Sequence, residues 1–207
     1  MKEKISKIHE FCVKYHVYYY LLLVLFLAID LISKYTIESI LLSKPNNRIQ
    51  VINGFFALQL VYNPGAFSGM LGGSLFGQII LVLLSFICGI AMVFGFVKYF
   101  NKITKFERYG LILAASGTIG NLVDRFLMVI QVQEGVIDFL EFDLGFMVWN
   151  TFNIADSLLV VGIIMFVVGY LLREYKSSKN KEKEREEFYQ SKKEEDPNNQ
   201  ESEQDHE

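Results

Sequence analysis

The 207-residue chain has few of the side chains on which disulfides, metal centres and serine hydrolases depend. It contains two cysteines, Cys12 before the first long apolar stretch and Cys88 within the second. Its three histidines, His9, His16 and His206, all fall in the terminal regions. This scarcity argues against a disulfide framework, a histidine-ligated metal and Ser-His chemistry.

Charge is also sparse over four long stretches, in a chain that is 52% hydrophobic and 14% aromatic. A helix needs about 20 predominantly apolar residues to cross a membrane, and ordinary soluble domains are less apolar than this chain. The sequence therefore predicts an all-α polytopic membrane protein. Its four transmembrane helices are expected at about residues 18–42, 74–97, 109–130 and 155–172.

The segments that flank these stretches predict the orientation in the membrane. Lys and Arg gather before the first stretch, between the second and third, and after the fourth. Because such residues tend to stay in the cytoplasm, we expect both termini there and residues 43–73 and 131–154 outside. A cleavable signal peptide at the N-terminus is not favoured, since no small-residue cleavage site follows the first apolar run.

The first outer segment has the pattern of a β-hairpin. Two β-rich runs, 49–52 and 55–62, flank Asn53-Gly54, and an Asn-Gly pair in that position is a strong hairpin signal. We expect a small extracytoplasmic β-hairpin or cradle over about residues 46–70. We also predict one transmembrane domain, residues 1–175, and a charged cytoplasmic tail, residues 176–207, which begins as a helix and becomes disordered.

Several ionisable residues lie inside or at the edge of the apolar stretches, where charge is costly. They are Asp30, Lys34, Asp124, Arg125 and Asp156. Counted along ideal helices, Asp30, Asp124 and Asp156 reach one depth near the outer surface, with Asp138 above them in the last connection. Two carboxylates at close range share a proton, and such a pair can activate water while giving a proton to a leaving amine.

Two aspartates compete for the place beside Asp156. Asp124 lies within the membrane, whereas Asp138 lies in the outer connection. We favour Asp138, because Asn121 and Arg125 offer Asp124 a structural pairing close by in the sequence.

Other polar and small residues have structural explanations. Asp30 and Lys34 are one helical turn apart and are expected to neutralise each other. Gly117 and Gly120 are three residues apart, a spacing that lets another helix approach closely. We expect them to be packing positions.

Five motif blocks occur in an order that closely resembles bacterial lipoprotein signal peptidase, the signal peptidase II family. The blocks are Asp30-Leu-Ile-Ser-Lys34, Asn63-Pro-Gly-Ala-Phe67, Gly117 with Gly120-Asn121-Leu-Val-Asp124-Arg125, Val136-Ile-Asp138-Phe139 and Phe152-Asn153-Ile-Ala155-Asp156. The resemblance covers about residues 15–173.

The resemblance implies an intramembrane aspartic endopeptidase that removes signal peptides from prolipoproteins, cleaving before a cysteine that carries diacylglycerol. It implies Asp138 and Asp156 as the catalytic pair and no metal or cofactor. The supporting or substrate-binding residues that it implies are Asp30, Lys34, Asn63, Gly65, Phe67, Gly117, Asn121, Asp124, Arg125, Val136, Asn153 and Ala155. The expected partners are lipid-modified prolipoproteins and membrane lipid, not nucleic acid, and the expected state is a monomer in the bacterial cell membrane with the active site near its outer face.

The main alternative is a proton-coupled transporter or small channel, because relays also use intramembrane carboxylates and lysines. The clustering of the carboxylates at one depth argues against a path through the membrane. A non-catalytic scaffold would explain the apolar stretches but would leave Asn121, Asp124, Asn153 and Asp156 without a purpose.

Overall fold

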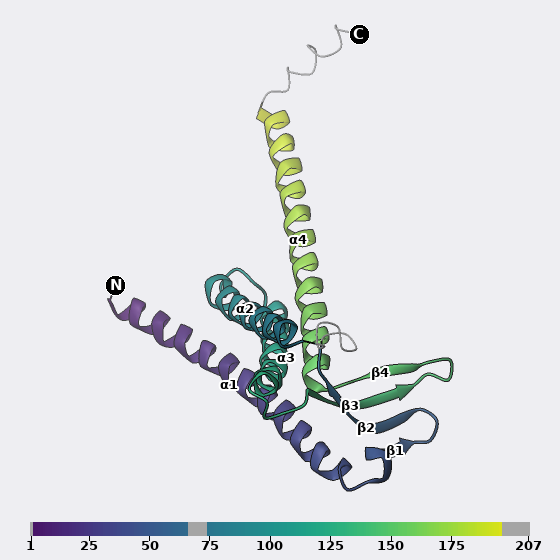
Figure 1. Ribbon diagram of the computed structural model, residues 1–207. Coiled ribbons are helices and arrows are strands. Elements are labelled where there is room, and N and C mark those ends of the chain that lie inside the picture. The colour runs from purple at the N-terminus through teal and green to yellow at the C-terminus, as the bar shows by residue number, and fades with distance from the viewer. Residues whose placement is uncertain (1, 66–73, 196–207) are drawn as a thin grey trace.

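The computed structural model describes residues 2–65 and 74–195, and the side chains of residues 16–65 and 74–192. Phe67, one of the predicted site residues, lies outside the described residues, as does His206, and the side chains of His9 and Cys12 are not described. The elements, in chain order, are α1 (Lys2–Leu41), η1 (Pro45–Asn47), β1 (Arg48–Ile52), β2 (Phe56–Asn63), α2 (Leu75–Tyr99), α3 (Lys105–Val129), β3 (Val136–Asp143), β4 (Val148–Phe152) and α4 (Ile154–Glu195) (Figure 1).

Four helices are long and apolar enough to span a membrane, as the sequence predicts. Within the described residues the candidate spans are His16–Leu41, Leu75–Tyr99, Lys105–Val129 and Ile154–Lys192. The helix α3 packs against α1, α2 and α4, and it is the most deeply buried of the four. The other three helices direct many large apolar side chains outward, as helices in contact with lipid do.

Short-range interactions set the starts of α2 and α3. The Ser74 hydroxyl accepts a hydrogen bond from the Gly77 backbone N–H at 3.1 Å. Thr104 and Glu107 form a capping box, in which each side chain accepts a hydrogen bond from the other residue's backbone N–H. Both arrangements satisfy backbone donors that the first turn of a helix leaves free.

The sheet is larger than the sequence predicts. The hairpin β1–β2 forms around Asn53-Gly54 as expected, with Gly54 at a φ of +69°. A second hairpin, β3–β4, comes from the connection between α3 and α4 and completes an antiparallel sheet in the order β1-β2-β3-β4. The pairing of β2 with β3 sets Asn63 opposite Val136 and Val61 opposite Asp138.

An apolar cluster joins the sheet to the end of α1. Leu41 of α1 packs with Leu60 of β2 and with Ile137 and Phe139 of β3, and all four side chains are buried. Ile137 and Phe139 flank Asp138, so the packing of this cluster sets the position of Asp138 relative to the helices. The sheet extends from the end of the bundle at which α1 ends and α4 begins (Figure 1).

The helix α4 continues well beyond its membrane-spanning part. It has 42 residues and remains helical to Glu195, so the described part of the predicted tail, residues 176–195, is helix. At about 1.5 Å of rise per residue, this extension projects about 30 Å from the other helices. The division at residue 175 into a transmembrane domain and a tail stays a prediction.

Candidate active site

A buried lysine holds two carboxylates together at the end of the bundle next to the sheet. The Lys34 ammonium of α1 lies 2.9 Å from Asp30 Oδ2, one turn earlier, and 2.9 Å from Asp124 Oδ2 of α3. All three side chains are fully buried. The ion pair expected between Asp30 and Lys34 is therefore present. The partner of Asp124 is Lys34 of another helix, however, and not its neighbour Arg125 as the sequence suggested.

Two asparagines continue this network toward the remaining aspartates. Lys34 Nζ donates to Asn121 Oδ1 at 2.9 Å, and Asn121 Nδ2 donates to Asp156 Oδ1 at 2.7 Å. Asn153 Nδ2 lies 3.1 Å from Asn121 Oδ1 and 2.7 Å from Asp138 Oδ1. The amides therefore link the ion pairs of α1 and α3 to the aspartates of β3 and α4.

Asp156 is held in the first turn of α4 by reciprocal hydrogen bonds with Asn153. The Asn153 backbone N–H donates to Asp156 Oδ2 at 3.1 Å, and the Asp156 backbone N–H donates to Asn153 Oδ1 at 2.9 Å. Between them, Ala155 is fully buried, and its N–H donates to Asp30 Oδ1 at 2.8 Å. The start of α4 is thus tied to α1, and a single residue, Asn153, contacts both Asp138 and Asp156.

Asp138 reaches the same network from the sheet. Its side chain is only 2% exposed, and Oδ2 accepts a hydrogen bond from Asn63 Nδ2 of β2 at 3.1 Å. Asn63 is oriented in turn by the Gly65 backbone N–H, which donates to Asn63 Oδ1 at 3.1 Å. Gly135, just before β3, approaches the Asn63 backbone so closely that a Cβ there would lie 2.8 Å from it. The turn after β2 and the start of β3 therefore position Asp138 together.

Burial, and after it the negative charge of Asp156, raises the pKa of the Asp138 carboxyl to about 7. The hydrogen bonds from Asn63 and Asn153 oppose this shift, because they favour the charged form. A carboxyl with this pKa holds a proton over much of the neutral range, so Asp138 can act as a proton donor.

The site carries more negative than positive charge. Asp30, Asp124, Asp138 and Asp156 are its carboxylates, and Lys34 and Arg125 are its cations. Arg125 Nη1 donates to Ser85 Oγ of α2 at 3.1 Å, while its Nε is buried without a hydrogen-bond partner among the described residues. With two cations for four carboxylates, one proton shared by Asp138 and Asp156 is favoured on electrostatic grounds.

Glycines let α3 and α4 approach closely at this level. A Cβ on Gly117 would collide with the Ala155 carbonyl and lie 2.8 Å from the Leu159 backbone nitrogen. A Cβ on Gly120 would collide with Asp30 Oδ2 and lie 3.3 Å from Ala155 Cβ. These contacts agree with a packing role for the two glycines, and they bring Asn121 within reach of Asp156.

The described structure brings almost every predicted site residue into one place. The residues gathered here are Asp30, Lys34, Asn63, Gly65, Gly117, Asn121, Asp124, Arg125, Val136, Asp138, Asn153, Ala155 and Asp156. Sequence reasoning missed Ser85 and Gly135, for which the sequence offered no local signal. It also missed β3 and β4, although the β-branched and aromatic residues of Val136–Asp143 could have indicated a strand.

The geometry supports one kind of chemistry. Two aspartates joined through one asparagine, with one of them holding a proton near neutral pH, can supply a base and an acid to a water molecule and a peptide bond. Among the described residues, no group of three His, Cys, Asp or Glu side chains is arranged to hold a metal ion. This pair, at the end of four helices that can span a membrane, defines the class of integral-membrane aspartic peptidases.

Comparison with known families specifies the class further. Residues 22–172 match the family described as "Signal peptidase (SPase) II". The chain belongs to the signal peptidase II family, whose members are aspartic peptidases. The transporter alternative is accordingly not favoured.

Individual relatives agree with this membership. A protein named "Lipoprotein signal peptidase" from Francisella tularensis subsp. novicida (strain U112) is 32% identical over 162 residues, which cover 77% of this chain and 94% of the relative. A protein of the same name from Sulfurihydrogenibium sp. (strain YO3AOP1) is 35% identical over 148 residues, covering 70% and 85%. A solved structure described as a bacterial membrane enzyme, obtained by the in meso method at 2.3 Å, superposes with a TM-score of 0.63 and 28% identity, covering 77% of this chain and 90% of that one.

Proposed function

We propose that this peptidase removes signal peptides from prolipoproteins by cleaving before a cysteine that carries diacylglycerol, with Asp138 and Asp156 as the catalytic pair. The observation that carries the assignment is the position of Asn153, which contacts both carboxylates. Asp124 is a weaker candidate, because its charge is already balanced by Lys34 at 2.9 Å.

The two carboxylates have different surroundings and therefore suit different roles. Asp156 is partly exposed and accepts hydrogen bonds on both oxygens, from Asn121 and Asn153, which suits a base. Asp138 is buried, and the pKa of about 7 suits an acid. Its proton is available at neutral pH, whereas an ordinary aspartate would already have lost it.

These roles give a balanced sequence of steps. Asp156 takes a proton from a water molecule, the water oxygen bonds to the scissile carbonyl carbon, and Asp138 gives its proton to the carbonyl oxygen. When the carbon–nitrogen bond breaks, the proton on Asp156 passes to the departing amine, and the proton on the new hydroxyl returns to Asp138. Asn153 keeps the two carboxylates in the same relative position through these steps, since it is hydrogen-bonded to both.

Other residues hold this geometry and do not react. Lys34 forms ion pairs with Asp30 and Asp124 and donates to Asn121, while Asp30 accepts from the Ala155 N–H, so these contacts hold Asn121 and the start of α4 in place. Asn63 and Gly65 brace Asp138 from the sheet, and Val136 begins the strand that carries it. Arg125 contributes positive charge close to the pair.

The distribution of Lys and Arg supports a location for this site. We place both termini in the cytoplasm and the sheet on the outer side of the cell membrane, because the basic segments flank the opposite ends of the helices. The protein acts as a monomer, with membrane lipid and lipid-modified prolipoproteins as its partners.

The direct test is cleavage by the purified full-length chain in detergent. We expect a diacylglyceryl-modified prolipoprotein to be cut before its modified cysteine and the same precursor without lipid to be cut much more slowly. Addition of a metal chelator should leave the rate unchanged. Equal cleavage of both precursors would contradict the lipid requirement, and no cleavage by folded protein would contradict the function.

A further inference from the structure

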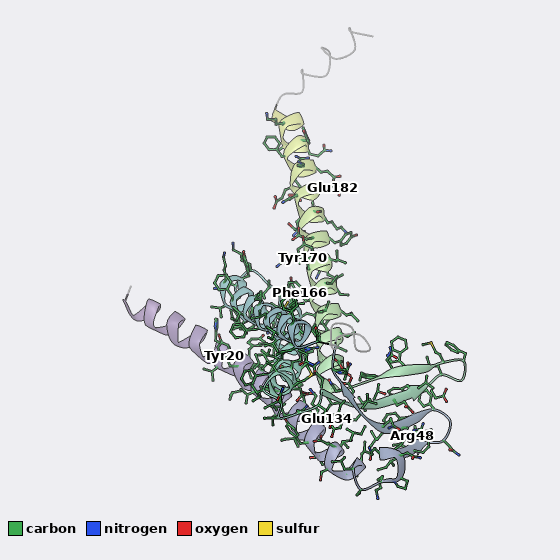
Figure 2. The ribbon with its side chains drawn as sticks, viewed as in Figure 1. Tyr20, Arg48, Glu134, Phe166, Tyr170 and Glu182 are labelled. Carbon is green, nitrogen blue, oxygen red and sulfur yellow. The ribbon has the colours of Figure 1, made fainter. Side chains whose placement is uncertain are left out.

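A cavity of about 820 Å³ lies between α2 and α4, at the end of the bundle away from the sheet. Both helices pack on α3, and Leu111 of α3 contributes to the lining. Met92 and Gly95 line the α2 side, and Phe166 and Tyr170 line the α4 side. The last two are labelled in Figure 2, where they lie level with α2. The volume is in the range of small-molecule sites, about 300–1,000 Å³, and the lining is mostly apolar.

One edge of this α2–α4 cavity is basic on both sides. Lys102 lines it after α2 and Arg173 lines it on α4. The Lys102 ammonium lies 5.9 Å from the centre of the Tyr99 ring, and the Arg173 guanidinium lies 5.4 Å from the centre of the Tyr170 ring. Each wall thus ends in a tyrosine beside a cation, a combination that is typical of the boundary between membrane and water.

Positive charge at this edge is not fully balanced. Arg173 Nη1 lies 3.3 Å from the buried Glu107 carboxylate, and Arg173 Nε lies 3.8 Å from Glu174. Lys102 forms no ion pair with any described residue. No aspartate or glutamate is found among the described residues that line the cavity. An anionic group would therefore meet the ammonium of Lys102, which no described carboxylate pairs with, beside the guanidinium of Arg173.

We propose that the α2–α4 cavity binds an anionic phospholipid, with its phosphate beside Lys102 and Arg173 and an acyl chain along the apolar walls. An apolar slot explains the need for an acyl chain, and the two cations explain the preference for negative charge, since each basic residue near an anionic lipid surface contributes to binding. The lipid would bridge α2 and α4, which otherwise meet mainly through α3.

The signal peptide of a substrate fits this cavity less well. Secretory leaders carry a basic region before their apolar run, and that region would be repelled by Lys102 and Arg173. The cavity is also distant from the catalytic pair, because Tyr170 follows Asp156 by about 21 Å along α4. The lipid site is therefore separate from the proposed function and does not depend on it.

Gly95 allows the cavity to be filled without disturbing the fold. A Cβ at this position would meet nothing within 4 Å, so Gly95→Leu can place its side chain in the open space. Gly95→Ala is the matched control, because it gives a similar gain in helix propensity but leaves most of the cavity empty. Only the leucine variant should lose lipid.

A variant of Lys102 and a matched control test whether positive charge at the cavity contributes to lipid binding. Lys102→Gln removes a cation that lines the cavity and has no ion-pair partner among the described residues. Lys105→Gln, in the exposed first turn of α3, removes the same charge close by in the chain but outside the lining. We expect Lys102→Gln to weaken binding of the anionic lipid about fivefold and Lys105→Gln to leave it unchanged.

The experiment is native mass spectrometry of the full-length chain in detergent, mixed with phosphatidylglycerol and phosphatidylcholine of identical acyl chains. Binding of phosphatidylglycerol in preference to phosphatidylcholine by the wild type and both controls, with loss in Gly95→Leu and Lys102→Gln, is the expected result. Equal binding of the two lipids, or full retention by Gly95→Leu, would overturn the proposal. Displacement of the lipid by a synthetic basic leader peptide would also overturn it and assign the cavity to the substrate. All of these readouts are independent of cleavage.

Discussion

The two ends of the helix bundle each bury carboxylates that pair with basic side chains, but they balance charge differently. At the end next to the sheet, the carboxylates Asp30, Asp124, Asp138 and Asp156 outnumber the cations Lys34 and Arg125. At the other end, Glu107 is fully buried but accepts a hydrogen bond from the Thr104 backbone N–H at 2.8 Å and lies 3.3 Å from Arg173.

The difference shows that buried charge alone does not make a reactive site. Glu107 has a cation and a backbone donor, so it closes the capping box and anchors α4 to α3. Asp138 is buried beside a second carboxylate, and burial first, then the charge of Asp156, raises its pKa to about 7 against the opposing effect of its amide donors. Burial next to a second carboxylate, with no ion-pair partner among the described residues, is what leaves a proton on Asp138 for chemistry at neutral pH.

The strongest test of this comparison removes the two carboxylates that we propose to be catalytic. Asp138→Asn and Asp156→Asn should each lower kcat by about 10²–10⁴-fold, because each removes an acid–base group. Rates of lipoprotein cleavage would be measured with helical content monitored alongside. The control is Glu134→Gln, which removes an exposed carboxylate just before β3 (Figure 2) and should retain activity. A modest loss in both aspartate variants would contradict the catalytic pair.

Removal of the ion-paired cation at each end should have unequal effects on the free energy of unfolding. Lys34→Met leaves Asp30 and Asp124 without their partner and should cost about 3–5 kcal/mol of unfolding free energy. Arg173→Gln should cost only about 1–2 kcal/mol, because Arg173 is partly exposed and Glu107 keeps its backbone donor. Thermal unfolding in detergent measures both.

A second substitution that removes one of the unpaired carboxylates tests whether charge imbalance causes the loss of stability in Lys34→Met. Lys34→Met combined with Asp124→Leu should recover part of the lost stability, since one unpaired carboxylate is removed with the lysine. Equal destabilisation by Lys34→Met and Arg173→Gln would remove the distinction between the two ends.

Glycines with close contacts lie at both ends of the bundle, so the effects of substituting them can be compared. Gly117→Ala would press a methyl group onto the backbone of Ala155 and Leu159, move the start of α4, and lower kcat by about 10²-fold through misplacement of Asp156. Gly169→Ala, near the other end, would press a methyl group onto Glu107, away from Asp138 and Asp156, and should change kcat little. Similar activity of the two variants would argue against backbone contact as the cause.

The smallest expected effect is the pH dependence that follows from Asp138. Its raised pKa means that the proton is held below about pH 7 and lost as pH rises through that value. If Asp138 acts as the acid, kcat/KM should fall by up to about tenfold per pH unit above about 7. Tyr62, whose pKa is raised to about 12 by burial and by Glu38, does not titrate in this range.

The same shift has a consequence for stability. The folded chain binds this proton more tightly than an unfolded chain, in which the carboxyl pKa is near 3.8. The free energy of unfolding should therefore decrease as pH rises from about 4 to about 7. An activity profile that stays flat to about pH 9 would show that Asp138 does not supply the proton.

Much of this architecture could be predicted from local sequence. Hydropathy indicated all four spans, because a helix in lipid must be apolar over its whole length, and Asn53-Gly54 indicated the first hairpin, because the turn needs those residues. The Asp30–Lys34 pair followed from helical spacing alone. The hairpin β3–β4 was missed, since no Asn-Gly or Asp-Gly pair marks its turn and β3 carries Asp138 in its buried half.

The number of helices, the small residues between α3 and α4, and the polar residues that had to be buried all follow from local sequence. The tertiary structure decided which of those residues meet. Asn63 and Asp138 are 75 positions apart and touch only because β2 pairs with β3, and Asp124 finds Lys34 only because α1 packs against α3. Periodicity and turn chemistry are local properties of the chain, whereas the balance of charge around a carboxyl depends on every element that is packed against it.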